Sequence, residues 1–271
     1  MLANARTWLV TGCSTGFGRA LAHALLERGE RVIVTARNRE RLKELIEPHA
    51  ARALALSLDI TRDSEIDAAV KASLEKFGAI DVLVNNAGYG TVGTVEETPI
   101  EVARATMETN YFGTLAMIRA VLPHMIQRGS GQIVNIGSVA GQVGFPLLAY
   151  YSASKFALAG MSESLAAELR PLGIAVTLAE LGPFATNFTK NMTVNVPAAH
   201  YDPAALARAA GNANWGAGDD PRPGAVALLT GLSVTDPPVR IILGRRGVDV
   251  AALHDARRAI ERERWLPVSQ L

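Results

Sequence analysis

Residues 7–18 read Thr-Trp-Leu-Val-Thr-Gly-Cys-Ser-Thr-Gly-Phe-Gly. The first five residues, Thr7–Thr11, form a short apolar run that is typical of a buried β-strand. Glycines at positions 12, 16 and 18 make a flexible turn after it. An apolar-periodic segment from about Gly18 to Arg28 then predicts a helix, which Gly29 ends. The chain therefore begins with a strand, a glycine-rich turn and a helix.

The same alternation of strand and helix continues along the chain. Further strands are expected at Arg31–Ala36, Ala53–Leu58, Ile80–Asn85, Gln132–Gly137, Ile174–Ala179 and Arg240–Leu243. Helices are expected at Arg39–Glu47, Asp63–Phe77, Pro99–Gln127 with an interruption or bend near Pro123, around Tyr151, and at Asp249–Trp265. Alternation of this kind, with nearly continuous apolar strands, predicts an α/β fold: a doubly wound parallel sheet, Rossmann-like, with helices on both faces. We expect residues 1–271 to form a single domain.

Two segments stand apart from this alternation. Residues 187–222 contain several prolines and glycines and a short alanine-rich helical patch at Pro203–Ala210. Long loops in compact domains are usually functional, so we expect a substrate-side lid loop there. Residues 247–271 are expected to form a charged C-terminal helical tail, which either covers the pocket or a subunit boundary or is simply solvated.

Composition excludes several classes of function. The net charge is +1 and 20% of residues are charged, which gives no electrostatic reason to expect a nucleic acid or a membrane surface as partner. No apolar run approaches the roughly 18 residues of a membrane span, and few residues precede the first strand. Cys13 is the single cysteine, which excludes an intramolecular disulfide. We expect a soluble, cytoplasmic protein.

Tyr151 and Lys155 are four residues apart, so in a helix their side chains share a face. A neighbouring ammonium favours the phenolate, and we therefore expect a lowered Tyr151 pKa and general acid–base chemistry. Ser138 supplies a hydroxyl at an expected strand end. Tyr150 is the rival proton donor, but it is turned about 100° away from the shared face. A chance pair on a surface helix is the alternative interpretation.

The glycine-rich turn favours a dinucleotide. Glycines let the backbone approach a pyrophosphate, and the helix N-terminus offers free N–H groups to it. The spacing is not the usual Gly-x-Gly-x-x-Gly, and a plain strand–helix turn is the alternative. Arg37 follows the second strand where an acid would bind a ribose 2′-hydroxyl, so we expect NADP(H) rather than NAD(H). Arg39 and Arg41 are close by and favour the same choice, and a solvated basic helix start is the alternative interpretation for these two. Asp59 is expected to accept a hydrogen bond from the adenine amino group, unless it only caps the next helix.

Five motifs together resemble the short-chain dehydrogenase/reductase family over roughly residues 5–190. They are Thr11-Gly-Cys-Ser-Thr-Gly-Phe-Gly18, Asn85-Asn-Ala-Gly88, Asn110, Ser138 and Tyr151-Ser-Ala-Ser-Lys155. A finer similarity, to the 17β-hydroxysteroid-dehydrogenase-like subgroup, rests on Thr35-Ala-Arg-Asn38, Asn110-Tyr-Phe-Gly113 and Gly182-Pro-Phe-Ala-Thr186. One departure is visible, because the family usually has Pro-Gly where this chain has Leu181-Gly182. The loss of proline is expected to loosen that turn or to widen the pocket.

The resemblance implies a role for each matching residue. Tyr151 would transfer the proton, Lys155 would lower its pKa and hold the nicotinamide ribose, Ser138 would bind the substrate oxygen, and Asn110 would hold a relay water. The implied cofactor residues are Gly12, Ser14, Thr15, Gly16, Phe17, Gly18, Arg37, Asp59, Asn86, Ala87, Gly88, Tyr151, Lys155, Phe184 and Thr186. It also implies a homo-oligomer, a dimer or tetramer, that packs helices Pro99–Gln127 and Tyr151–Arg170 between subunits.

The expected activity is hydride transfer between NADP(H) and a ketone or secondary alcohol. The residues expected to line the substrate pocket are Gln142, Phe145, Tyr150, Phe184, Phe188 and Met192, which favours an apolar or alicyclic small molecule. Phe184, Phe188 and Met192 recur every four residues, so a lid helix is an alternative interpretation. An epimerase or dehydratase on the same fold, or a cofactor-binding protein without catalysis, are the competing functions. The five histidines and Cys13 show no metal-binding spacing.

Overall fold

The computed structural model describes residues 5–188, 190, 192–194, 201–202 and 218–270. Seven parallel strands form one sheet in the order β3-β2-β1-β4-β6-β7-β9. The strands are β1 (Thr7–Val10), β2 (Arg31–Ala36), β3 (Ala53–Ser57), β4 (Val82–Asn85), β6 (Gly131–Ser138), β7 (Ile174–Leu181) and β9 (Arg240–Leu243). The predicted doubly wound parallel sheet is confirmed, and each of its strands was expected to within two residues at either end.

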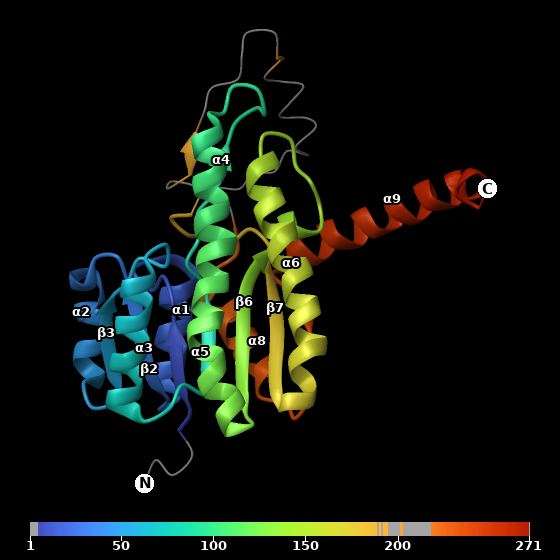
Figure 1. The fold of residues 1–271 in the computed structure, drawn as a ribbon. Helices are drawn as coiled ribbons and strands as arrows, with labels where there is room; N and C mark the ends of the chain where they lie inside the picture. The colour runs from blue at the N-terminus through green and yellow to red at the C-terminus, as the bar shows by residue number, and fades with distance from the viewer. Residues whose placement is uncertain (1–4, 189, 191, 195–200, 203–217, 271) are drawn as a thin grey trace.

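Helices cover both faces of the sheet (Figure 1). The longer ones are α1 (Gly16–Glu27), α3 (Asp63–Phe77), α4 (Ile100–Met107), α5 (Thr114–Arg128), α6 (Ala149–Leu169), α8 (Pro221–Leu232) and α9 (Arg245–Ser269). Helices α3, α5 and α6 pack on one face, and α1, α8 and the short α2 (Lys43–Ile46) pack on the other. This two-sided burial is why the strands read as nearly continuous apolar runs.

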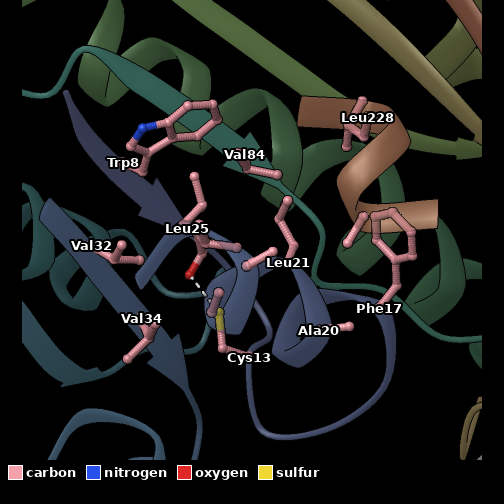
Figure 2. Close-up of a cluster of buried hydrophobic side chains, with 14 of the residues drawn as sticks. Trp8, Cys13, Phe17, Ala20, Leu21, Leu25, Val32, Val34, Val84 and Leu228 are labelled. Atoms are coloured by element: carbon pink, nitrogen blue, oxygen red, sulfur yellow. Dashed lines mark hydrogen bonds between the residues drawn. The ribbon is translucent and has the colours of Figure 1, made fainter. Parts of the chain in front are cut away.

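Strand β1 shows how one strand serves both faces. Trp8 and Val10 belong to the cluster with α1 and α8, whereas Leu9 belongs to the cluster on the opposite face. Figure 2 shows the first cluster, in which Leu21 and Leu25 of α1 lie among the strand residues. All five side chains are at most 4% exposed. The glycine-rich turn that follows β1 is therefore anchored at both of its ends in the core.

The strand order reverses between β1 and β4. From β1 the chain moves outward through β2 and β3, and it then returns to place β4 on the other side of β1. In open parallel sheets, ligands bind outside the carboxyl ends of the strands at such a reversal. Gly12 and Gly16 lie at this position, and both have a positive φ, +74° and +66°.

Some elements differ from the sequence-based expectation. The segment expected as a helix at Arg39–Glu47 consists of 3₁₀ turns flanking the four residues of α2, and Asn38 caps its start by accepting a hydrogen bond from Glu40 N at 3.0 Å. Helix α5 continues through Pro123; the departure from α-helical geometry lies instead at the π-helical segment Glu108–Gly113. Helix α8 was not expected, because its first turn carries two prolines.

Phe184, Phe188 and Met192 lie in a bridge, a turn and a bend, so the described residues do not place the three in one helix. Phe184 forms an isolated bridge with Asp219, and Thr193–Val194 form a short strand, β8. Strand β8 pairs in parallel with β5 (Thr91–Val92). The expected helical patch at Pro203–Ala210 lies outside the described residues.

The C-terminal helix α9 projects away from the body of the molecule (Figure 1). Every residue from Asp255 to Gln270 is exposed. Among the described residues, no helix combines the length and the apolar character needed to cross a membrane.

Candidate active site

A cavity of about 790 Å³ opens at the carboxyl ends of the strands, where the strand order reverses. Its size lies within the usual range for small-molecule sites, roughly 300–1,000 Å³. The motifs that the sequence analysis singled out meet in its wall. The lining residues expected from sequence are Gly12, Ser14, Thr15, Gly16, Phe17, Arg37, Asp59, Asn86, Ala87, Gly88, Ser138, Tyr151, Lys155, Phe184, Thr186, Phe188 and Met192.

The glycine-rich turn is held in place by Asn86. Its Nδ2 donates hydrogen bonds to the carbonyls of Thr11 and Gly12, at 2.8 and 3.0 Å. A Cβ on Gly12 would lie 2.9 Å from the Ala87 Cα, and a Cβ on Gly18 would overlap Asn86 Nδ2. Gly18 does not line the cavity; it allows the close packing that shapes the turn. The turn leaves backbone exposed to the cavity at the N-terminus of α1, which suits an anionic group.

Two arginines from the residues that follow β2 line the cavity. Arg37 was expected there, and Arg41 joins it, whereas Arg39 does not line the cavity. The backbone of Arg41 is held by Arg19, whose Nη1 donates a hydrogen bond to the Arg41 carbonyl at 3.0 Å. The sequence left Arg39 and Arg41 open between a 2′-phosphate site and a solvated helix start, and of these two only Arg41 lines the cavity.

Asp59 lines the same cavity and also caps the following turn. Its Oδ1 accepts hydrogen bonds from the amide and the hydroxyl of Thr61, at 3.0 and 2.7 Å. Burial raises the pKa of the Asp59 carboxyl, but the Thr61 hydrogen bonds and the charges of Arg62 and Arg37 together hold it below its ordinary value. Asp59 therefore lines the cavity and caps the turn, and its hydrogen bond to an adenine amino group stays a prediction.

Tyr151 and Lys155 lie together on the first two turns of α6. The Lys155 Nζ is 6.0 Å from the centroid of the Tyr151 ring and donates a hydrogen bond to the Ile136 carbonyl at 2.8 Å. Ser138, at the end of β6, is hydrogen-bonded to the Tyr151 phenol. All three side chains are at most 8% exposed, and all three line the cavity.

The expected lowering of the Tyr151 pKa is wrong for this structure. Burial raises the pKa of the phenol to about 12, and the hydrogen bond with Ser138 only partly opposes it. Burial also lowers the pKa of Lys155 to about 8. Desolvation is the largest cause of both shifts, because both groups sit in the protein interior. At neutral pH the phenol therefore keeps its proton.

Asn110 lies behind the cavity wall, in the π-helical segment. Its side chain accepts a hydrogen bond from Tyr89 N and donates to Tyr89 O and Ser154 Oγ, at 3.1, 2.9 and 3.0 Å. Both amide hydrogens are thus used. A methyl group on Gly88 would lie 2.9 Å from Asn110 Oδ1 and 3.8 Å from Lys155 Nζ, so Gly88 separates the two side chains. The structure places Asn110 next to Lys155 but behind Gly88.

The loop after β7 closes the cavity over the glycine-rich turn. The rings of Phe184 and Phe17 are 5.5 Å apart, and a methyl group on Gly16 would lie 3.4 Å from Thr186 Cβ. The turn at Leu181-Gly182, where the family usually has Pro-Gly, is hydrogen-bonded to β9. Leu181 ends β7, and Gly182 N donates to Leu243 O at 2.8 Å, which extends the pairing with β9.

The pocket candidates divide into two groups. Phe188, whose ring lies 5.6 Å from that of Tyr151, and Met192 line the cavity with Phe184. The other three, Gln142, Phe145 and Tyr150, are not lining residues of this cavity. Gln142 donates to Glu180, and the Tyr150 hydroxyl donates to Val95 O at 2.9 Å. These partners are distant in sequence, so the direction of the side chains was not readable from spacing.

Three lining residues, Leu148, Tyr89 and Thr35, were not assigned to the site from the sequence. The buried Thr35 hydroxyl has no hydrogen-bond partner among the described residues. Its place in the motif Thr35-Ala-Arg-Asn38, at the carboxyl end of β2, is the signal that pointed to it. In the described part of the chain no cluster of side chains suits a metal ion. Burial raises the pKa of the Cys13 thiol to about 12, so it is an unreactive core residue.

The chain is similar to known proteins along its whole length. Residues 6–196 match the model of the short chain dehydrogenase family. A short-chain dehydrogenase from Streptomyces avermitilis is 40% identical, with a TM-score of 0.91, covering 100% of this chain and 99% of that one. A short chain dehydrogenase from Burkholderia cenocepacia in complex with NADP is 31% identical, with a TM-score of 0.76, covering 98% and 99%. The oxidoreductase BOA17 of Botryotinia fuckeliana is 33% identical over 97% of this chain and 98% of its own length.

Proposed function

The chain belongs to the short-chain dehydrogenase/reductase family of NAD(P)-dependent oxidoreductases, and on this premise we propose that it reduces an uncharged ketone, or oxidises the matching secondary alcohol, with NADP(H). The observation that carries the proposal is the joint burial of Ser138, Tyr151 and Lys155 in one cavity wall, beside a glycine-rich turn built for a dinucleotide.

The residues present fit such a cofactor. Gly12 and Gly16 line the cavity without side chains, and the unpartnered Thr35 hydroxyl and the exposed Arg37 line the same cavity beside the turn, where Cys13 N donates to Thr35 O at 2.8 Å. We assign the pyrophosphate end to the glycine-rich turn, the adenosine end to Asp59 and residues 86–88, and the nicotinamide end to Phe184 and Thr186. When bound, the cofactor supplies or accepts the hydride.

The protein's own contribution is the proton and the stabilisation of charge on oxygen. In reduction, Ser138 and Tyr151 donate hydrogen bonds to the carbonyl oxygen, and Tyr151 gives up its proton as that oxygen becomes an alkoxide. The Lys155 ammonium stabilises the phenolate that remains and holds the ribose. We propose that Asn110 supports reprotonation of the pair through a water bound behind Gly88.

The preference for NADP(H) is supported by two cationic side chains in one cavity end, Arg37 and Arg41. A 2′-phosphate is a doubly charged hydrogen-bond acceptor, and the planar guanidinium group of arginine binds phosphate well through paired N–H donors. The Burkholderia cenocepacia neighbour was crystallised with the same cofactor.

The substrate class follows from the remaining wall. Phe188, Met192 and Leu148 are apolar, and Lys155 is the one ammonium or guanidinium group on this side among the described residues. Anionic substrates would lack a counter-charge, so we propose an apolar or alicyclic ketone.

We further propose that residues 187–222 act as the substrate-side lid and that residues 247–271 form a separate tail. We also propose that the chain is close to the 17β-hydroxysteroid-dehydrogenase-like subgroup.

A panel of uncharged ketones tests this function through NADPH consumption at 340 nm. Turnover supports a carbonyl reductase. Conversion of a substrate without net NADPH consumption would instead support an epimerase or dehydratase, and tight NADPH binding without any conversion would support a cofactor-binding protein.

We also propose a cytoplasmic homo-oligomer, a dimer or tetramer. Phe112 and Phe156 are 48% and 39% exposed, the first beside α5 and the second on α6, and those helices lie side by side (Figure 1). In light scattering, the double variant Phe112→Glu/Phe156→Glu should have a smaller molar mass than the wild-type protein. Val226→Glu on α8, also exposed but on the other face, is the control.

A further inference from the structure

The entry to α6 contains an unusual backbone conformation. Leu147 has φ +65°, and it is the one non-glycine residue in the described part of the chain with a positive φ. A leucine adopts this left-handed conformation only when surrounding contacts impose it. Its carbonyl accepts a hydrogen bond from Gly93 N at 2.8 Å. The strained turn is thus fastened to the segment Gly90–Thr98, named here the 90–98 loop.

Tyr150 makes a second attachment to the same loop. Its hydroxyl donates to the Val95 carbonyl at 2.9 Å, so two hydrogen bonds join the 90–98 loop to the start of α6, one at Leu147 just before the helix and one at Tyr150 in its first turn. Between the two attachments lies Leu148, which is 5% exposed and lines the cavity together with Tyr151. The Leu148 carbonyl accepts from Ser152 N at 2.7 Å, which begins the helical bonding of α6.

The 90–98 loop also holds the opposite wall of the substrate side. Thr193 N donates to Gly90 O at 3.1 Å, and β8 pairs with β5 in this loop. A methyl group on Gly90 would lie 2.7 Å from Met192 Cε, so Met192 packs directly on the loop. Leu148 and Met192, from segments more than 40 residues apart, are therefore both positioned by one loop.

We propose that Tyr150 is a positioning residue for substrate selectivity. By fastening the 90–98 loop to α6, it sets the spacing between Leu148 and Met192 and so the size of ketone that reaches Tyr151. The proposal rests on the proposed function for its kinetic readout. Tyr150 itself does not line the cavity and takes no part in proton or hydride transfer.

The test compares Tyr150→Phe, which removes only the hydroxyl, with wild type on cyclohexanone and 2-decalone. The ratio of kcat/KM for the two ketones should shift at least fivefold, while kcat on cyclohexanone and the KM for NADPH stay within about twofold. Tyr111→Phe is the matched control, since Tyr111 is outside the cavity wall. An unchanged ratio overturns the proposal, and so does an equal loss on both ketones with a raised KM for NADPH, because that is a general structural defect.

Leu147 provides a second, independent variant. Leu147→Ile keeps the number of atoms but adds β-branching, which disfavours a positive φ, whereas Leu147→Asn tolerates it. The isoleucine variant should reproduce the shift in ketone ratio and the asparagine variant should not; the reverse order contradicts the proposal.

Amide hydrogen exchange tests whether Tyr150 holds the 90–98 loop without any need for enzyme activity, so it separates this inference from the proposed function. Exchange at Gly93 and Thr193 should be at least tenfold faster in Tyr150→Phe than in wild type or Tyr111→Phe. If wild type consumes no NADPH with any ketone, the proposed function fails, and the exchange rates alone decide whether Tyr150 holds the loop. Equal rates in all three proteins would show that it does not.

Discussion

Lys155 Nζ lies 6.0 Å from the Tyr151 ring centroid and is hydrogen-bonded to the Ile136 carbonyl, so the ammonium is buried beside the phenol without forming an ion pair with it. Burial raises the pKa of Tyr151 to about 12 and lowers the pKa of Lys155 to about 8. At pH 7 the pair therefore holds both of its protons, the state that suits proton donation to a carbonyl.

Tyr151→Phe should lower ketone reduction by a factor of roughly 10² to 10⁴, the usual worth of a positioned general acid. Its ring contacts with Phe188 would remain, so NADPH binding and stability should change little. Steady-state kinetics and fluorescence titration with NADPH measure the two effects. Tyr150→Phe, whose hydroxyl is bonded to Val95 outside the cavity, should retain a measurable turnover. Equal inactivation by the two substitutions would contradict the assignment of Tyr151.

Lys155→Met should abolish turnover but stabilise the fold at pH 7. The folded-state pKa of about 8 lies below the ordinary value of 10.5, so the native state carries a buried charge at neutral pH at a free-energy cost. Removing the buried charge should raise the free energy of unfolding by about 1–3 kcal/mol. The loss of the hydrogen bond from Lys155 to the Ile136 carbonyl opposes part of this gain.

The pH dependence of this effect has a defined sign. As pH rises from about 8 to 10.5, the unfolded chain holds the Lys155 proton more tightly than the folded chain does, so wild type gains stability. The advantage of Lys155→Met over wild type should shrink across that window. Urea unfolding of both proteins at about pH 7 and pH 9.5 checks it, and a constant difference would argue against a lowered Lys155 pKa.

Arg41→Ala should weaken NADPH binding about 10- to 100-fold and leave NADH binding unchanged, because a charge-assisted hydrogen bond is worth about 1.5–3 kcal/mol. Arg37→Asp should go further and shift preference toward NADH. Calorimetric titration with both cofactors measures this. Arg39→Ala is the control, since Arg39 is outside the cavity wall. Tighter wild-type binding of NADH than of NADPH would refute the role of both arginines.

Gly18→Ala should weaken NADPH binding at least tenfold and destabilise the protein by about 1–3 kcal/mol. The new methyl group would overlap Asn86 Nδ2 and displace it from the carbonyls of Thr11 and Gly12, which shape the glycine-rich turn. Thermal unfolding with and without NADPH reads out both effects. Gly144→Ala meets no atom within 4 Å and should behave as wild type. A wild-type response from Gly18→Ala would show that the turn tolerates movement of Asn86.

The sequence was sufficient for the sheet because the signals of a buried parallel strand are local. Val32–Val34 and Leu83–Val84 are apolar whatever the tertiary arrangement, and the glycines that end α3 and α5 adopt the positive φ that side chains avoid. Helix α8 was missed for the same reason: two prolines in its first turn read as a loop, although proline is well suited to a helix start.

The candidate site was predictable as a set of motifs but not as a geometry. The alternation of strands and helices along the sequence was enough to predict that Ser138 ends a strand and that Tyr151 and Lys155 lie at the start of the next helix. Side-chain direction depends on contacts between distant segments, so only the tertiary structure assigned Arg41 to the cavity and Tyr150 to Val95. Burial likewise exists only in the folded chain. For that reason the Tyr151 pKa, which the neighbouring lysine was expected to lower, is raised by desolvation instead.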